Sequence, residues 1–124
     1  MSNKGDESLA RVGGRAGIDI DGSVGPITDT SADEAIAAPG AGKRIGITAI
    51  MVTNADDTDG TLVSIRSAST VIWWGFAKVE AGWSINFTKP LMAAENEAIT
   101  VICGTAVTNG VYASINGVVL PTNG

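Results

Sequence analysis

The acidic stretch Asn54–Gly60 is the part of the chain whose residue types come closest to a metal site. With Gly60 at the sixth position of a calcium-binding loop, Asp57 and Asp59 take the third and fifth positions, as such a loop requires. The same alignment places Ala55 and Arg66 at the first and twelfth positions, where carboxylates are needed. We therefore predict no metal site. A solvated turn between two strands is the favoured interpretation, and weak cation binding by the carboxylates of this turn is the alternative.

The glycine-rich stretch Gly40–Arg44 invites comparison with a phosphate-binding loop, in which backbone amides surround the phosphates. Two positions depart from that motif. Ala37 stands where the first glycine of the motif is needed, and Arg44 replaces the Ser or Thr that would bind magnesium. We predict no nucleotide site and no cofactor.

The residues that most enzymes use are scarce in this chain. It has no histidine, which removes the commonest general base and the commonest transition-metal ligand. Cys103 is the single cysteine and lies in an apolar stretch, so we expect a small core residue rather than a nucleophile. Paired carboxylates remain, but the acids considered fall at predicted turns and strand ends: Asp33, Glu34, Glu80, Glu95 and Glu97. We predict no catalytic residues and no enzymatic activity.

Length and charge narrow the class of protein. A chain of 124 residues is enough for one domain with one core. Its formal charge of −5 and its lack of clustered Lys and Arg argue against nucleic acid as a partner.

Residues 1–14 contain no apolar run, so we expect no signal peptide. The longest apolar run, Ile45–Val52, is far shorter than the ~20 residues of a membrane helix, so we expect no membrane contact and synthesis in a cytoplasm.

All three tryptophans and both phenylalanines fall in one short window. From Trp83 to Phe87, apolar and polar residues alternate, which is typical of a half-buried strand. From Val71 to Ala77 both faces are apolar, which indicates burial on both sides, by the core or by a neighbouring subunit. We expect Trp74, Phe76 and Trp83 to pack in the core, and Trp73 to lie either there or at a contact between subunits.

Strand-like segments bounded by turn residues fill the chain after residue 30. They are Asp33–Ala37, Arg44–Thr53, Thr61–Arg66, Thr70–Lys78, Trp83–Thr88, Ala98–Val107 and Val111–Val119. We expect Asn109-Gly110 to form a hairpin turn between the last two segments, and Asn116-Gly117 to form a turn or bulge. Lys89-Pro90-Leu91 is expected to end the strand before it, because proline cannot donate to a central ladder. The spacing of the turns predicts an all-β fold, a sandwich or a barrel.

Residues 1–30 differ from the rest of the chain, because apolar residues are scattered among charged residues and glycines. We predict an extended N-terminal arm over residues 1–30 and a β-sandwich domain over residues 31–124. Such an arm can lie along a partner and order on contact. The candidate contact residues are the apolar residues of this arm and one tryptophan: Leu9, Val12, Ile18, Ile20, Val24, Ile27 and Trp73.

Three pieces between Ile45 and Val119 share a pattern with one class of proteins. They are Val52-Thr53-Asn54 followed by Thr61–Ile65, then Gly82–Leu91, then Glu95–Val101 followed by an expected hairpin over Thr105–Gly117. In these pieces the chain resembles small virion proteins of tailed bacteriophages, in particular head-decoration, or cement, proteins. The resemblance implies an eight-stranded jelly roll, a homotrimer, and an N-terminal arm that reaches a neighbour or the major capsid protein.

From the residues and the resemblance together, we expect an antiparallel β-sandwich of jelly-roll type in a phage virion. Its expected function is to bind the outer capsid surface and to stabilise the junctions between capsomers, as a homotrimer in contact with the major capsid protein. The alternative is a receptor- or carbohydrate-binding module of a phage tail or fibre. In that case an exposed Trp73 or Trp83 would stack on a sugar.

Overall fold

The computed structural model describes residues 11–12 and 15–122, and every regular element in this part of the chain is a β-strand. The strands are β1 (Arg11–Val12), β2 (Arg15–Ala16), β3 (Ile18–Ile27), β4 (Asp33–Ile36), β5 (Lys43–Asn54), β6 (Thr61–Ser67), β7 (Thr70–Ala77), β8 (Gly82–Met92), β9 (Ile99–Cys103) and β10 (Val111–Pro121). None of the described residues belongs to a helix long and apolar enough to cross a membrane. The two short strands β1 and β2 pair with each other, and the other eight build the fold.

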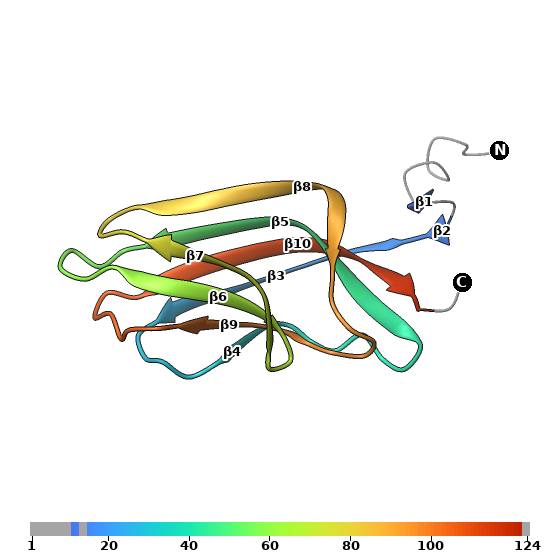
Figure 1. Cartoon of the computed structure of the whole chain (residues 1–124), viewed down its shortest axis with the longest axis horizontal. Coiled ribbons are helices and arrows are strands. Elements are labelled where there is room, and N and C mark those ends of the chain that lie inside the picture. Colours follow the sequence, from blue (N-terminus) through green and yellow to red (C-terminus); the bar gives the residue numbers. More distant parts are fainter. Residues whose placement is uncertain (1–10, 13–14, 123–124) are drawn as a thin grey trace.

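Those eight strands form two antiparallel sheets of four strands that face each other (Figure 1). The order in one sheet is β3-β10-β5-β8, and the order in the other is β4-β9-β6-β7. Along the chain, each strand is followed by a strand of the opposite sheet, except at the β6–β7 hairpin. This alternation is jelly-roll connectivity. The predicted all-β antiparallel sandwich is therefore confirmed.

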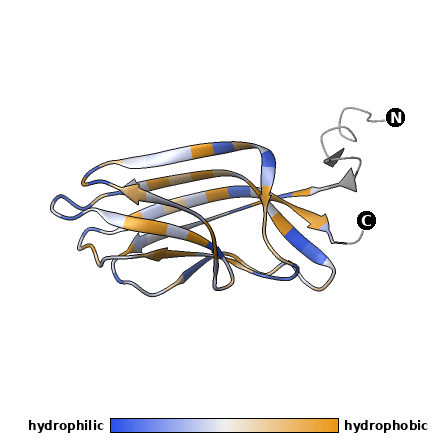
Figure 2. Cartoon of the chain, viewed as in Figure 1, coloured by the Kyte–Doolittle hydropathy of each residue, from blue (hydrophilic) through white to orange (hydrophobic). Residues whose placement is uncertain are grey.

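The core lies between the two sheets and consists mostly of β-branched residues, which favour strands. β10 illustrates the pattern, since its residues alternate between buried and exposed from Val111 to Asn116. Hydrophobic residues recur along the strands of both sheets (Figure 2). The most deeply buried large side chains are Ile27, Ile45, Ile47, Ile50, Val52, Val63, Ile65, Ile99, Val101, Val107, Val111 and Ile115.

The seven segments predicted as strands are all strands in the structure, but two of the predicted ends are wrong. β9 ends at Cys103 instead of Val107. β8 continues through Pro90 to Met92 instead of ending before it. It can do so because β8 is an edge strand, and its register against β5 shifts between Asn86 and Leu91, which leaves Pro90 in an irregular stretch. The predicted bulge at Asn116-Gly117 is confirmed, because the register of β10 against β5 shifts at that point.

The hairpin predicted at Asn109-Gly110 is wrong. β9 lies in one sheet and β10 in the other, so the two strands do not pair. Gly110 has the positive φ of a turn residue (88°), but Asn109 is not among the described non-glycine residues with positive φ. The Asn109 N–H instead donates to the carboxylate of Asp56, 3.0 Å away. Long-range pairing of β10 with β3 and β5 thus overrides the local turn signal.

Residues 18–27 of the predicted arm form β3, which pairs with β10 along most of its length. β3 also crosses close to β4 of the other sheet, since a Cβ placed on Gly22 would lie 1.9 Å from the Ala35 carbonyl oxygen. The first strand of the sandwich therefore comes from a segment that sequence reasoning assigned to the arm. The division of the chain at residue 30 into two domains stays a prediction.

The expectation that Trp74 and Phe76 pack in the core is wrong, because their side chains are 62% and 57% exposed. From Trp73 to Ala77, the inward face of the strand is the one that carries Trp73, Gly75 and Ala77. Sequence alternation cannot choose between two apolar faces. Gly75 on this inward face leaves room for the indole of Trp83 on β8.

Candidate functional site

The carboxylate of Asp56 is fully engaged by groups of its own chain. It accepts hydrogen bonds from the N–H of Asn109 (3.0 Å), the N–H of Asp59 (2.8 Å), and both the N–H and the hydroxyl of Thr58 (3.3 and 3.0 Å). These bonds, that of Asn109 first, lower the pKa of Asp56 to about 2. The donors point their hydrogens at the carboxylate oxygens that a cation would need. Asp56 is thus a structural carboxylate in the turn that resembles a calcium loop.

Further hydrogen bonds connect this turn to the neighbouring loops at the same end of the sandwich. The side-chain amide of Asn54 donates to the carbonyls of Asp59 (3.0 Å) and Ala77 (3.2 Å). The N–H of Glu80 donates to the carbonyl of Asp56 (2.9 Å). The β5–β6, β7–β8 and β9–β10 connections therefore meet around Asn54 and Asp56. Groups of three or more candidate metal ligands do not occur among the residues that the structure describes.

The Gly40–Arg44 stretch was compared above with a phosphate-binding loop. Backbone amides of this stretch also donate hydrogen bonds to side chains of the same chain. The N–H of Gly40 donates to the side-chain oxygen of Asn96 (2.9 Å), and the N–H of Gly42 donates to the carboxylate of Glu95 (2.7 Å). A phosphate at this turn would compete with a carboxylate for the same amide. The turn between β4 and β5 is therefore tied to the β8–β9 connection.

Cys103 is a core residue, as predicted. Its side chain is buried at the end of β9. Burial first, and then the charge of Asp33, raise the pKa of the thiol to about 11. The nucleophilic thiolate is consequently rare at neutral pH.

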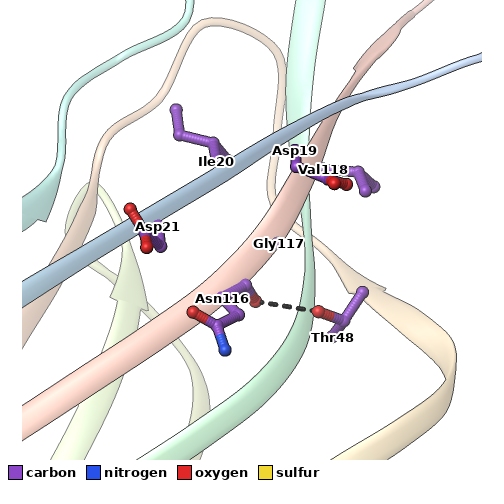
Figure 3. Close-up of a pocket in the computed structure, with 7 residues that line it drawn as sticks. All are labelled: Asp19, Ile20, Asp21, Thr48, Asn116, Gly117 and Val118. Carbon is purple, nitrogen blue, oxygen red and sulfur yellow. Dashed lines mark hydrogen bonds between the residues drawn. The ribbon is translucent and has the colours of Figure 1, made fainter. Parts of the chain in front are cut away.

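An open hollow of about 420 Å³ lies on the outer face of the first sheet (Figure 3). It forms where the register of β10 shifts at Gly117, a residue without a side chain, and where the Thr48 hydroxyl donates to the Asn116 carbonyl (3.2 Å). Asp19 and Asp21 of β3 contribute exposed carboxylates on one side. Sequence reasoning missed this hollow because three strands build it; the Asn116-Gly117 bulge was the one local signal.

The exposed large apolar side chains form the other notable feature of the surface. Leu62, Trp74 and Phe76 lie on neighbouring strands β6 and β7, with Leu62 directly opposite Phe76 in the ladder. We refer to these three residues as the β7 patch. On the first sheet, Met51 of β5 and Tyr112 of β10 are also exposed.

The predicted contact residues do not form one surface. Leu9 lies outside the described residues, and Val12 lies in β1. Within β3, Ile18 is exposed, Ile20 and Val24 pack partly against the core, and Ile27 is a core residue. Trp73 lies on β7 and packs edge-to-face on Phe87, with ring centroids 5.1 Å apart. β3 is one edge strand of the first sheet, and β8 is the opposite edge strand of that sheet. β7 is an edge strand of the second sheet and lies next to β8, so β3 and β7 are on opposite sides of the sandwich. Their role in contacts stays a prediction.

Comparison with known proteins gives little to add to this geometry. No protein-family model matches the chain, and no curated protein matches it. Among solved structures, a chain of the capsid asymmetric unit of cyanophage Pam1 is similar, with a TM-score of 0.44 and 14% identity. The similarity covers 94% of this chain and 96% of that chain.

Proposed function

We propose that this protein is a structural component of a bacteriophage particle, where it binds the outer surface of the capsid and reinforces the junctions between capsomers. Its partners in this proposal are the major capsid protein and further copies of the chain. It is made in the host cytoplasm and resides on the virion surface. Self-association is part of the proposal, and the family resemblance implies a homotrimer as one form of it.

The observation that carries the proposal is the set of large apolar side chains on the outer faces of the sandwich. Trp74 and Phe76 are exposed on one sheet, and Met51 and Tyr112 on the other. Clustered exposed apolar side chains are typical of surfaces that contact other proteins. A rigid jelly roll that presents such side chains on both faces is suited to bridge neighbouring subunits of a lattice.

The pieces behind the family resemblance fall on successive parts of the sandwich. Val52-Thr53-Asn54 ends β5, Thr61–Ile65 lies in β6, and Gly82–Leu91 makes up most of β8. Glu95–Val101 leads into β9. The resemblance supports a jelly roll through these strands, and it supports a capsid partner through the class of proteins that it names.

Binding of the purified protein to capsids that lack it tests the proposal directly. Cryo-electron microscopy of such capsids is expected to show density at every threefold or quasi-threefold position. Multivalent contact with a repeating lattice raises the effective affinity, so occupancy is expected to be high even if each contact is weak. Capsids without added density would contradict the proposal.

A carbohydrate- or receptor-binding module of a phage tail or fibre is the second candidate. Trp74 favours it, because an indole that is 62% exposed offers a flat apolar face to a sugar ring. In this candidate function Trp74 takes the place of Trp73 and Trp83 as the sugar-stacking residue, because Trp73 and Trp83 are only partly exposed and pack against the core. Quenching of Trp74 fluorescence by host glycans, absent in a Trp74→Phe variant, would support this candidate over the first.

We also propose that the protein is not an enzyme. Support comes from the two groups that came closest to reactive chemistry in the sequence. The carboxylate of Asp56 accepts hydrogen bonds from its own chain, and the thiol of Cys103 is buried with a raised pKa. A screen for hydrolase activity on peptidoglycan and capsular polysaccharide tests this proposal; turnover by the purified protein would overturn it.

A further inference from the structure

The two sheets have four edge strands, which differ in how well they are protected from pairing with another chain. β3 and β8 are the edges of the first sheet, and β4 and β7 are the edges of the second. An edge strand presents unpaired backbone N–H and C=O groups. Proteins prevent unwanted pairing there with charged side chains, proline, bulges or very short strands.

Three of the four edges carry such features. β3 contains Pro26 and the acidic pair Asp19 and Asp21. β4 is only 4 residues long and begins Asp33-Glu34. β8 contains Lys89-Pro90 within the stretch where its register against β5 shifts. β3 and β4 are therefore poor templates for a strand from another chain, and β8 is one in the half that contains Lys89-Pro90.

β7 carries none of these protections on its outward side. Its 8 residues, Thr70–Ala77, include no charged residue and no proline. Its irregularity, between Ile65 and Arg66 in the ladder with β6, lies near one end of the strand. From Trp73 to Ala77 the pairing with β6 is regular, so the other side of this stretch is a straight, uncharged edge.

The backbone geometry shows which groups of β7 face the open side. The Leu62 carbonyl accepts a hydrogen bond from the N–H of Gly104 (2.8 Å), so the polar backbone groups of Leu62 point toward β9. Leu62 and Phe76 are opposite each other and are thus a non-hydrogen-bonded pair of the β6–β7 ladder. The N–H and C=O groups of Phe76, and those of Trp74 two residues earlier, consequently face away from β6. They are placed to bond to a further strand.

We propose that β7 pairs antiparallel with β7 of a second copy of this chain, which joins the two β4-β9-β6-β7 sheets into one continuous sheet. Charge favours β7 over β3 and β4 as the edge through which two copies pair. The chain has a formal charge of −5, and pairing two copies through β3 or β4 would bring acidic residues together. A β7–β7 contact brings no formal charges together within the paired strands.

The side chains beside this edge fit the same arrangement. Trp74 and Phe76 of each copy would meet their counterparts on the outer face of the joined sheet, where each is now more than half exposed. Aromatic cross-strand pairs are among the favourable pairs of antiparallel sheets. The contact uses the same surface on both copies and therefore closes as a twofold dimer. The inference rests on the self-association in the proposed function. It assigns that association to one strand, and it puts a twofold dimer in place of the homotrimer that the family resemblance implies.

Light scattering coupled to size-exclusion chromatography on the full chain tests the pairing. The expected mass is twice the chain mass of 12.6 kDa. A Trp74→Lys variant places like charges beside the twofold axis and is expected to weaken the dimer by about tenfold or more. Thr53→Lys is the control for the added charge, because Thr53 is also exposed but lies on β5, a central strand of the other sheet. Phe76→Lys provides a second variant, and circular dichroism verifies that each variant is folded.

Hydrogen exchange of backbone amides adds a second measurement, whose result depends on pairing of the β7 edges. Protection of the backbone amides of Trp74 and Phe76 is expected to rise with protein concentration in the unmodified chain. A monomeric wild-type protein, a trimer, or a dimer that survives both lysine variants would overturn the β7 pairing. Capsid binding is scored separately, by density on capsids, so a bound trimer would overturn the pairing and leave the proposed function standing. A dimer that does not bind capsids would overturn the proposed function and leave the β7 pairing standing.

Discussion

The indole of Trp83 on β8 lies directly against the backbone of Gly75 on β7, across the interface between the two sheets. A Cβ placed on Gly75 would lie 2.7 Å from Cε2 of Trp83 and 2.9 Å from its Nε1. On the same side of the sandwich, Trp73 and Phe87 make their edge-to-face contact. Gly75 thus allows the edge strands of the two sheets to approach each other over a layer of aromatic rings.

Gly75→Ala is therefore expected to destabilise the protein, because the added methyl group overlaps the indole in a packed region. The expected loss of unfolding free energy is about 1–3 kcal/mol, measured by urea denaturation. Gly104→Ala is the control, since a Cβ there would lie 3.5 Å from its nearest neighbour, an ordinary contact. Equal stabilities of the two variants would contradict the packing of Trp83 on Gly75.

Asp56 is expected to make the stability of the protein sensitive to acid. Hydrogen bonds, first that from the Asn109 N–H, lower its pKa in the folded protein to about 2, below its usual value of 3.8. The unfolded chain therefore binds a proton more readily than the folded chain in this range. The stabilising contribution of the carboxylate is complete above about pH 4 and is lost as the pH falls toward 2.

Urea midpoints of the wild type and of Asp56→Asn, measured between pH 7 and pH 2, check this expectation. The variant is expected to be less stable than the wild type at pH 7, because an amide cannot accept all the bonds that the carboxylate accepts. The difference between the two proteins is expected to shrink between pH 4 and pH 2. Asp57→Asn, at the exposed neighbouring position, is the control and should change stability by less than about 0.5 kcal/mol. A constant difference across the pH range would assign the loss to something other than the charge.

Sequence reasoning located the strands well because their signals are local. Alternation with period two and turn residues suffice to place β5, β6 and β9 within a few residues. Two kinds of feature could not be predicted from the sequence. Where both faces of a strand are apolar, as around Trp74, alternation does not indicate the inward face. Where a segment is sparse in apolar residues, as in β3, its pairing with a distant strand leaves no local trace.

The same limit explains what was missed at the candidate sites. The hydrogen bond from Asn109 to Asp56 joins residues far apart in the chain, and it replaces the hairpin that Asn109-Gly110 predicted. The hollow beside Asp19 is built from three strands whose neighbourhood follows from the sheet order. Local sequence gives residue types, whereas contact sites depend on the order of strands in a sheet. The exposure of Trp74 is therefore a structural finding.

Ile50 and Met51 are neighbours in β5 and test the inward and outward faces of this strand. The Ile50 side chain is 1% exposed in the core, whereas that of Met51 is 58% exposed. Ile50→Ala is expected to lower the unfolding free energy by about 2–5 kcal/mol, because it leaves a cavity. Met51→Ala should change it by less than about 0.5 kcal/mol. Chemical denaturation of both variants gives the comparison, and similar losses would mean that the register of β5 is shifted.

Cys103 is expected to react with a thiol reagent only when the protein unfolds. Its thiol is buried, and burial raises its pKa to about 11, so both access and thiolate are lacking at pH 7. The rate of reaction with Ellman's reagent is expected to follow the unfolding rate as urea is added. Rapid reaction of the native protein would show that the end of β9 opens readily.

Trp74 is expected to account for most of the quenchable tryptophan fluorescence. Its indole is 62% exposed, whereas Trp73 and Trp83 pack partly against the core. At protein concentrations low enough to separate the copies, Trp74→Phe is expected to reduce iodide quenching strongly. Trp73→Phe is the control and is expected to leave quenching nearly unchanged. If β7 pairs with a second copy, quenching of the wild type should also fall as its concentration rises, because Trp74 then lies beside the paired edge. Strong quenching in Trp74→Phe would contradict the outward orientation of this residue.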